Sequence, residues 1–600
     1  MQTSLNTSFR VSAIVAVLAA ALCAVHAVAQ VPQLPEGRLP YVERPWTNDA
    51  DKFSFVILGD KTSGGEGKWP IYDRAVDAIN LLDPDFVITV GDQIPGHMEE
   101  RDRWDAEWAE YMEHARRIEA PMFLVPGNHD IANVECYEYW KQDFGHTYYS
   151  FDYKDCHFLV LNTEEERFDG RGPVWEAMMT FAETDLASHA QSRHTFLFFH
   201  KPMWDDPRFL DDWARLERAL GERHYTAVAG HEHYLMTEGE GGHLRVIQSA
   251  TGGGIHLSGV KEYGCFHSFG FVTVDGSDAR YAVVEPEGGV WPADIAPASF
   301  RRAVVFEMVA LDAEMPENVG TDTVRVRAVA RLRNVLNEPV TLEVAIAPLG
   351  KSGWQPVIET GSPWTLDGDA ATMRKTLAPG SSVSVPLAFQ VTPERVPYPP
   401  AARWSVTYKG ETLSAEGRPL EKTDVVPIYP ARVMREVPAW QGIGPCQIGP
   451  IDTAQLPQDP EKANPYFVKP LGPESGYEEG RVYEQGRTWQ PCTPQRKGLL
   501  NLNGLMGTLD LAAAFACFKV YSPVEQVVFA DVYADNFAQV YVNGALSEGG
   551  QTFGAPGGYI HAPVHLREGW NSVVVKVVNN RGDWFLRFLM ADPEGNLRFE

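Results

Sequence analysis

Short apolar runs alternate with longer amphipathic stretches between residue 51 and about residue 285. Apolar runs bounded by polar or glycine-rich positions predict seven strands, at 53–58, 86–90, 122–125, 157–161, 195–199, 226–229 and 244–248. Apolar residues at a period near 3.6 predict helices at 72–82, 103–118, 175–189 and 211–220. Segments 148–151 and 269–274 favour additional antiparallel strands. The pattern predicts an α/β domain over residues 50–290 in which helices cover a sheet.

The pattern changes near Trp291. Strict apolar/polar alternation at 323–329 and 340–345, with turn signals between such segments, predicts a β-sandwich of immunoglobulin or fibronectin type over residues 301–425. A proline- and glycine-rich stretch follows. Strands resume at 527–533, 538–542 and 572–578, with a hairpin turn at Asn543-Gly544, which predicts a second all-β domain over residues 435–600.

The first 29 residues have the pattern of a secretory signal peptide. Arg10 precedes an apolar run, and Ala27-Val28-Ala29 supplies the small residues of a cleavage site. Residues 30–49 are rich in proline and polar residues and are typical of a linker. No later apolar run approaches the ~20 residues that span a bilayer. We therefore predict a secreted or periplasmic chain without a membrane span.

The net charge indicates which partners to expect, and the cysteines indicate which disulfides could form. The formal net charge is -28, which argues against nucleic acid as a partner because so acidic a surface repels polyanions. Of the seven cysteines, one lies in the predicted leader. In an oxidising compartment Cys136–Cys156 and Cys446–Cys492 are the candidate disulfides, since each pair is close in sequence.

Polar side chains follow the strands of the predicted α/β domain. They are Asp60, Asp92, Asn128-His129-Asp130, His200, His231 and His233. Open α/β sheets bind ligands at the carboxyl ends of their strands, so these side chains are expected to converge. Two carboxylates, an amide and three imidazoles form a mixed nitrogen and oxygen site that suits Mn, Zn or Fe.

The order Asp60, Gly91-Asp92, Gly127-Asn128-His129-Asp130, His200 and Gly230-His231-Glu232-His233 resembles the calcineurin-like metallophosphoesterase superfamily. The resemblance implies a β-sandwich flanked by helices, two divalent or trivalent metal ions, and hydrolysis of a phosphate mono- or diester by a metal-bound hydroxide. It implies that Asp60 and His233 bind the first metal, that Asp92 bridges both, and that Asn128, His200 and His231 bind the second. His129 is then the proton donor or transition-state stabiliser, oriented by Asp130.

Two positions depart from the family pattern. Thr62 stands where the family has the histidine of its first motif, and Pro95 stands where it has a second aspartate. The first metal is therefore expected to be held weakly unless His97, His256 or His267 substitutes. The Gly64–Lys68 segment lacks the spacing of a phosphate-binding loop and is expected to border the site. Trp69, Trp204 and Tyr234 could line a substrate pocket or could simply pack.

The C-terminal region resembles galactose-binding-like jelly rolls of exported bacterial enzymes. The residues that carry the resemblance are 440–445, 534–536, 542–544 and 569–571. It implies carbohydrate binding, with a structural spacer as the alternative, and Asp535 and Asn536 are turn residues or calcium ligands. Two functions therefore remain open for the whole chain. One is an exported phosphoesterase, and the other is a non-catalytic binding or scaffold protein with a degenerate phosphoesterase domain.

Overall fold

The fold is taken from a computed structural model. It describes residues 51–62, 69–255, 257–314, 323–347, 353–395, 400–415, 418–419, 424–425, 433–448, 469–483, 486–495, 498–507, 509, 511–534, 537–551, 558–579 and 584–600. The predicted leader, the linker, the Gly64–Lys68 segment, His256, Asp535 and Asn536 lie outside these residues. Among the residues described, no helix has the length and apolar character needed to cross a membrane.

The first sheet mixes parallel and antiparallel strands. In spatial order it contains β12 (Val290–Pro292), β11 (Asp278–Val284), β10 (Phe269–Asp275), β1 (Lys52–Leu58), β2 (Phe86–Thr89) and β3 (Met122–Phe123). The β1, β2 and β3 strands run parallel, and β10 pairs antiparallel with β1. The carboxyl ends of three sequence-adjacent parallel strands therefore share one edge.

The second sheet has the same size. Its spatial order is β4 (Tyr149–Tyr153), β5 (Cys156–Val160), β6 (Thr195–Phe198), β7 (Tyr225–Ala229), β9 (His243–Ile247) and β8 (Met236–Glu240). The strands β5, β6, β7 and β9 are parallel, whereas the edge strands β4 and β8 are antiparallel to their neighbours.

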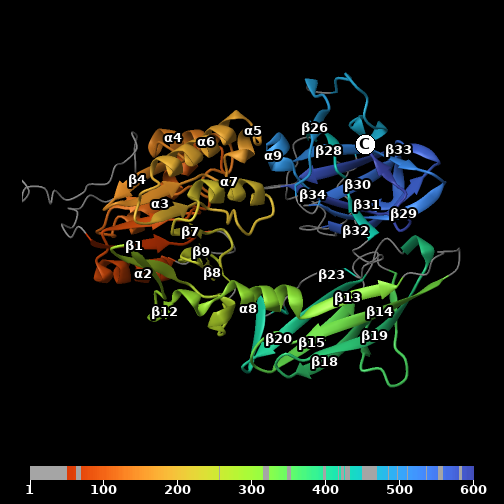
Figure 1. Ribbon diagram of the computed structural model, residues 1–600, viewed down its shortest axis with the longest axis horizontal. Coiled ribbons are helices and arrows are strands. Elements are labelled where there is room, and N and C mark those ends of the chain that lie inside the picture. Colours follow the sequence, from red (N-terminus) through yellow and green to blue (C-terminus); the bar gives the residue numbers. More distant parts are fainter. Residues whose placement is uncertain are drawn as a thin grey trace, which may run out of the picture.

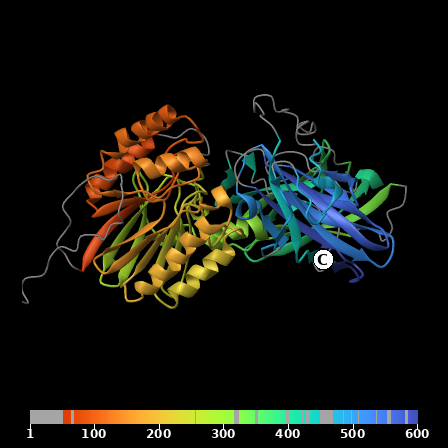
Figure 2. The same cartoon turned by 90° about the horizontal axis from the view of Figure 1, so that it is seen from above.

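The two sheets pack face to face through an aromatic core. Phe55 of β1 contacts Phe158 of β5 and Phe196 of β6, with ring centroids 5.5 and 5.0 Å apart. Helices cover both outer faces (Figure 2). On the first sheet these are α2 (Trp69–Leu82), α3 (Arg101–Ala115) and α4 (Val134–Asp143), and on the second α6 (Pro173–Ser188) and α7 (Leu210–Leu220). This confirms the α/β arrangement.

Helix α4 was not anticipated from the sequence. Its apolar residues are mostly aromatic and sparse, so the helical period is weak. The helix begins at a local signal, because the Asn133 side chain accepts a hydrogen bond from the Cys136 backbone N–H at 2.8 Å. A short helix, α5 (Glu166–Asp169), follows β5 and was also missed.

The predicted start of β structure at residue 301 is wrong in detail. Helix α8 (Ala298–Arg302) continues as a π-helical turn over Ala303–Glu307. Phe300 and Val304 are buried there in the hydrophobic cluster of the following β-region, and that cluster also includes Tyr263. The helical segment therefore carries apolar residues from the first region into the core of the next.

The middle region contains two sheets (Figure 1). Buried apolar residues of both sheets belong to one hydrophobic cluster. The smaller comprises β13 (Val309–Glu314), β14 (Val324–Arg333), β19 (Ser382–Val391) and β16 (Gln355–Val357). The larger comprises β17 (Thr365–Asp367), β18 (Ala370–Leu377), β15 (Val340–Ala347), β20 (Ala401–Tyr408), β21 (Glu411–Ala415) and β22 (Arg418–Pro419), with β23 (Asp424–Val425) pairing to β20.

The C-terminal region also has two sheets, whose facing sides share a second cluster. One contains β24 (Met434–Glu436), β34 (Phe585–Ala591), β29 (Gln526–Ala534) and β32 (Gly558–Leu566), with β27 (Leu499–Asn501) paired to β34. The other contains β26 (Gln490–Cys492), β25 (Trp440–Gln447), β28 (Ala512–Ser522), β33 (Gly569–Asn579), β30 (Phe537–Val542) and β31 (Ala545–Gln551), with β35 (Arg598–Phe599) paired to β28.

The C-terminal region contacts the α/β region through helix α9 (Leu502–Met506) and its flanks. The Arg171 backbone N–H donates to the Gly504 carbonyl at 2.6 Å. The Asn501 side chain donates to Glu166 Oε2 at 3.0 Å, in a buried position. Polar hydrogen bonds therefore join these two regions across more than 300 residues of sequence.

The candidate disulfides do not form. All six cysteines beyond the predicted leader are buried free thiols. Cys136 belongs to the core beneath helices α2–α4, and Cys156 belongs to the core between the sheets. Cys446 and Cys492 likewise belong to different clusters. Proximity in sequence failed because the two members of each pair face different cores.

Candidate metal centre

Polar side chains leave the carboxyl ends of strands in both sheets of the α/β region. Asp60 follows β1, Asp92 follows β2, and the Asn128-His129-Asp130 segment follows β3. His200 follows β6, and His231 and His233 follow β7. Because the two sheets pack face to face, these ends meet, and the six predicted metal ligands converge in one cluster.

The tightest part of the cluster is built around Asn128. Its Oδ1 lies 2.9 Å from His200 Nε2 and 2.9 Å from His231 Nδ1. His200 Nε2 also lies 3.4 Å from Asp92 Oδ1. Four side chains from four different strand ends therefore share one small volume.

Asp60 and His233 form the other part of the cluster. His233 Nε2 lies 3.2 Å from Asp60 Oδ2, and the same oxygen accepts the His231 backbone N–H at 3.0 Å. One ligand atom each from Asp60, Asp92 and His200 lies within 4.8 Å of the others. The two parts are thus joined through the carboxylates.

Backbone carbonyls orient two of the imidazoles. His200 Nδ1 donates to the Val90 carbonyl at 2.8 Å, and His233 Nδ1 donates to the Gly254 carbonyl. In the neutral ring, each contact places the lone pair on Nε2, which is the nitrogen that faces the carboxylates. Such contacts are typical of metal-binding histidines.

The electrostatics of the cluster follow from buried carboxylates beside imidazoles. Burial lowers the pKa of His200, but the Asp92 carboxylate outweighs it and raises that pKa to about 10. Burial also opposes the charge on His233, whereas its contact with Asp60 raises the pKa to about 9. Burial opposes ionisation of Asp92, but His200 and His129 hold its pKa well below the usual range. The cluster therefore favours positive charge between its carboxylates.

The carboxylate, amide and imidazole atoms of the cluster are suited to binding cations. Asp60 Oδ1 is buried and has no hydrogen-bond partner, which is costly for a carboxylate oxygen unless a cation binds it. A Cβ at Gly230 would lie 2.3 Å from that oxygen, and a Cβ at Gly91 would lie 2.3 Å from His200 Nδ1. Glycine is required at both positions because the strand ends approach so closely.

Three of the candidate ligands have left-handed backbone conformations. The φ angles are 57° at Asp92, 70° at His231 and 56° at His233. Such angles are uncommon for residues with a Cβ and tend to cluster at functional sites. Here the angles are part of the turns that bring the three side chains into the cluster.

Asp130 was expected to orient His129, and among the residues described no hydrogen bond joins their two side chains directly. Both Asp130 carboxylate oxygens accept backbone N–H groups, from Asp92 and Gly127 at 2.8 Å and from Gln93 at 2.9 Å. His129 Nδ1 instead lies 2.6 Å from the Pro95 carbonyl. Asp130 thus holds the loops after β2 and β3 together, because its buried carboxylate accepts N–H groups from both.

Pro95 was identified only as a missing ligand, yet its carbonyl holds the half-exposed His129 ring. A backbone acceptor leaves no signal in the sequence. The same applies to Val90 and Gly254. The buried ion pair between Lys201 Nζ and Glu164 Oε2, at 2.9 Å and next to His200, was also missed, although Lys201 lies two residues and Glu164 three residues beyond the end of a predicted strand.

The substitutes considered for the first-motif histidine are distributed around the cluster. Thr62 is buried, and its backbone N–H donates to the Asp92 carbonyl at 3.1 Å. His97 packs edge-on against His129, with ring centroids 4.5 Å apart. His267 Nδ1 lies 3.1 Å from the Ala250 carbonyl. His97 is therefore adjacent to the centre.

The three aromatic residues suggested as pocket walls serve packing. Trp69 stacks on His114 with a centroid separation of 3.9 Å, and Lys61 Nζ lies 3.6 Å above its ring. Trp204 is buried, and the Arg301 guanidinium lies 3.4 Å from the Tyr234 ring centroid.

The sequence is similar to known phosphatases over part of its length. The serine/threonine-protein phosphatase CPPED1 of Rattus norvegicus is 28% identical over 189 residues, which cover 27% of this chain and 59% of that relative. The Homo sapiens protein of the same name is 30% identical over 161 residues, covering 24% and 50%. The chain thus spans 50% to 59% of the length of these curated relatives. A solved dimetal phosphatase from Danio rerio has 13% identity and a TM-score of 0.30, covering 38% of this chain and 95% of that structure.

The family model of the calcineurin-like phosphoesterases matches residues 53–235. The match begins within β1 and ends just after His233, so it includes all six candidate ligands, His129 and Asp130. Residues 53–235 form a calcineurin-like phosphoesterase domain.

Proposed function

We propose that the protein is an exported, metal-dependent phosphoesterase that hydrolyses a phosphate mono- or diester. The observation that carries the proposal is the buried Asp60 carboxylate oxygen without a hydrogen-bond partner, within a cluster of imidazole and amide donors. The pattern of residues 1–29 supports export. The relatives named as serine/threonine-protein phosphatases make phosphoserine and phosphothreonine esters the first substrates to test.

Asp60, Asp92 and His233 would hold a first cation, and Asp92, Asn128, His200 and His231 a second. When bound, the two cations would lower the pKa of a shared water and polarise the phosphoryl oxygens. The first position has only three protein ligands, because Thr62 replaces a histidine. Its cation should therefore be the first to leave in a chelator.

His129 would handle the proton of the leaving group. The Pro95 carbonyl accepts the Nδ1–H of its ring, which leaves Nε2 as the nitrogen that exchanges a proton with substrate. Half-exposure of the ring suits this role, because the group must meet a substrate that enters from solvent. The His129 backbone N–H meanwhile donates to Asp92 Oδ1 at 2.9 Å and couples the loop to the bridging carboxylate.

The proposal is tested by comparing Asp92→Asn with Asp83→Asn. Both aspartates have positive φ, 57° and 51°, and asparagine tolerates that conformation, so the two changes are matched in backbone cost. Aryl phosphate mono- and diesters and phosphoserine peptides serve as substrates, and metal content is measured by mass spectrometry. If Asp92→Asn loses metal and activity and Asp83→Asn does not, the result supports the phosphoesterase proposal. A metal-free wild type whose activity equals that of Asp92→Asn supports the scaffold alternative.

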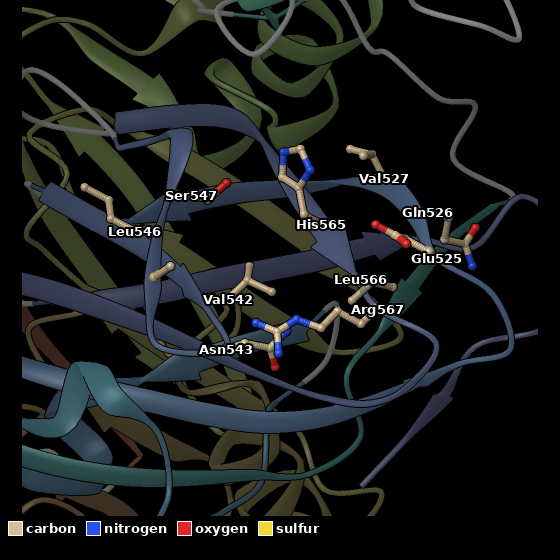
Figure 3. A pocket seen from close by; sticks show the side chains of 11 residues that line it. Glu525, Gln526, Val527, Val542, Asn543, Leu546, Ser547, His565, Leu566 and Arg567 are labelled. Carbon is tan, nitrogen blue, oxygen red and sulfur yellow. The ribbon is translucent and has the colours of Figure 1, made fainter.

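A second role, carbohydrate binding by the C-terminal region, is favoured by a pocket of about 570 Å³. Figure 3 shows Glu525, His565 and Arg567 around it, with Val527 and Leu546 at its sides. Charged groups beside apolar surface suit sugar hydroxyls and ring faces, and the volume lies in the range of ligand sites, roughly 300–1,000 Å³.

This role is tested with the full chain on a glycan array. Arg567→Ala should abolish any signal, whereas Arg374→Ala, which removes an exposed arginine from the middle region, should not. A blank array for the wild type leaves the C-terminal region as a spacer.

A further inference from the structure

Two segments beside the candidate metal centre also make the contact with the C-terminal region. Residues 161–171 follow strand β5 and include helix α5, and residues 199–209 follow strand β6 and include His200. Helix α9 of the C-terminal region lies against α5 (Figure 1). The Gln495 side chain, from the same region, donates to the Arg208 carbonyl at 2.7 Å. The C-terminal region therefore contacts both segments.

The backbones at the ends of α5 and α9 approach each other closely. A Cβ at Gly170 would lie 2.8 Å from the Gly504 carbonyl oxygen, and a Cβ at Gly507 would lie 3.1 Å from the Arg167 carbonyl oxygen. The φ angles of Gly170 and Gly507, 67° and 76°, also favour glycine. Each side of the contact thus carries a glycine where the backbone of the other side approaches it.

Three consecutive glutamates of the first segment, Glu164, Glu165 and Glu166, are fully buried. Glu166 Oε2 accepts from the Asn501 side chain at 3.0 Å and lies 3.4 Å from Arg171 Nε. Because desolvation offsets much of the attraction within a buried ion pair, such groups contribute little net stability. They do fix the geometry of the segment, since each buried carboxylate requires its donors in place.

Glu164 joins this segment to the residue that follows His200. Its Oε2 accepts from Lys201 Nζ at 2.9 Å and from the Arg167 guanidinium at 3.1 Å. Its Oε1 accepts from the Thr163 hydroxyl at 3.3 Å, and the hydroxyl oxygen accepts the Lys201 backbone N–H at 3.1 Å. Lys201 is therefore held both at its backbone and at the end of its buried side chain.

The peptide group between His200 and Lys201 is held on both sides. Its N–H donates to the Thr163 hydroxyl, and its carbonyl accepts the Gly230 N–H at 2.9 Å. Because a peptide group is planar, fixing both of its polar atoms fixes the backbone from which the His200 side chain leaves. Rotation of this peptide would displace His200 Nε2 from its place 2.9 Å from Asn128 Oδ1.

We propose that Thr163, Glu164 and Lys201 are positioning residues for His200, and that the C-terminal region supports them by holding residues 163–171 through helix α9. The inference rests on the proposed function, in which His200 binds the second cation. Groups that surround metal ligands influence metal affinity by orienting those ligands. The family match ends at residue 235, so part of the support for the metal centre would come from outside the matched residues.

Gly170→Ala and Gly221→Ala are a matched pair of variants for the test. Both glycines directly follow a helix, and their φ and ψ angles are 67° and -147° at Gly170 and 63° and -136° at Gly221. Alanine therefore brings similar backbone strain at both positions. Its methyl group would lie 2.8 Å from the Gly504 carbonyl oxygen in the first variant, whereas no atom lies within 4 Å in the second. Only Gly170→Ala should disturb the contact with the C-terminal region.

The affinity of the full chain for Mn²⁺ is measured by titration calorimetry, with circular dichroism to check that each variant is folded. Gly170→Ala should weaken the tighter Mn²⁺ site by about 10-fold, because the second position has the larger ligand set. Lys201→Met, which leaves the contact between the regions unchanged, should have a similar effect. Gly221→Ala should bind Mn²⁺ as the wild type does. The double variant Gly170→Ala/Lys201→Met should lose no more than the larger single loss, because both changes act through the support of His200.

Equal Mn²⁺ affinities in Gly170→Ala, Lys201→Met and Gly221→Ala would overturn the inference, even in an active phosphoesterase. Fully additive losses in the double variant would overturn it too, because the two positions would then act independently. A wild type that binds Mn²⁺ but hydrolyses no phosphate ester would contradict the proposed function alone. The affinity differences would then still decide whether the C-terminal region supports His200.

Discussion

The two ends of strand β6 carry histidines with opposite properties. His200, at the carboxyl end, lies beside Asp92, and its pKa is raised to about 10 although burial opposes the charge. His194, at the amino end, is also buried but has no carboxylate among its hydrogen-bond partners in the described structure, and burial lowers its pKa to about 4. Burial alone therefore does not define a site. The neighbouring carboxylates do, and strand ends determine where they converge.

The largest effect is expected at the carboxyl end. Asp92→Asn should reduce kcat/KM by at least about 10³-fold, because it removes the carboxylate that would bridge both cations. Asp83→Asn, just before the amino end of the same strand β2, should leave kcat/KM within about 2-fold of the wild-type value. Steady-state kinetics with metal analysis distinguishes the two, and similar losses in both variants would mean that the ends of the sheet are not functionally distinct.

Replacing His129 should have a smaller effect that depends on the substrate. His129→Gln should lower kcat by about 10²- to 10³-fold for an alkyl phosphate, whose leaving group needs a proton. The loss should be several-fold smaller for a nitrophenyl ester, which leaves readily without one.

His146→Gln is the control for this comparison, since that side chain is exposed. Equal losses for both esters would assign His129 to binding or charge stabilisation in place of proton transfer.

At the amino end of strand β6, His194 should make the free energy of unfolding depend on pH. Its folded pKa of about 4 lies below the unfolded value of about 6.5, so the unfolded chain binds a proton that the folded chain excludes. Stability should therefore be complete above about pH 6.5 and should fall as the pH drops toward 4, by about 3 kcal/mol from this group. Urea unfolding of the wild type and of His194→Gln, which has no titrating ring, should diverge over this range.

The acid response of His146→Gln should remain parallel to that of the wild type, because the substituted side chain is exposed and lies outside the core around His194. Parallel profiles for His194→Gln as well would show that the buried ring titrates normally.

The smallest predicted effect concerns the contact between the C-terminal region and the segment that follows the carboxyl end of strand β5. Asn501→Ala should destabilise the chain by about 2 kcal/mol, because Glu166 loses a buried hydrogen-bond donor. Asn596→Ala, at an exposed side chain, should cost less than about 0.5 kcal/mol. Thermal unfolding measures both, and equal midpoints would mean that the two regions are not coupled through this contact.

Local patterns were sufficient for the strands that precede the candidate ligands and for the identity of those ligands, whereas the edge strands β8 and β12 and the strand β11 were not predicted. The apolar runs before Asp60, Asp92, His200 and His231 are strands as predicted, because a run buried on both faces has few alternatives. The ligand types are recognisable because strand ends rarely carry so many polar residues. Helix α4 was missed because its cap and aromatic packing, and not its period, define it.

The sequence by itself determined the α/β architecture of the first region, the β character of the rest, and the residues that supply donors to the centre. Tertiary structure decided what those donors contact. It assigned the orientation of His129 to the Pro95 carbonyl, made Asp130 a loop anchor, and separated the cysteine pairs into different cores. It also brought His157 and His189 together across 32 residues. Such contacts depend on backbone carbonyls and on packing between distant segments, and neither has a local sequence pattern.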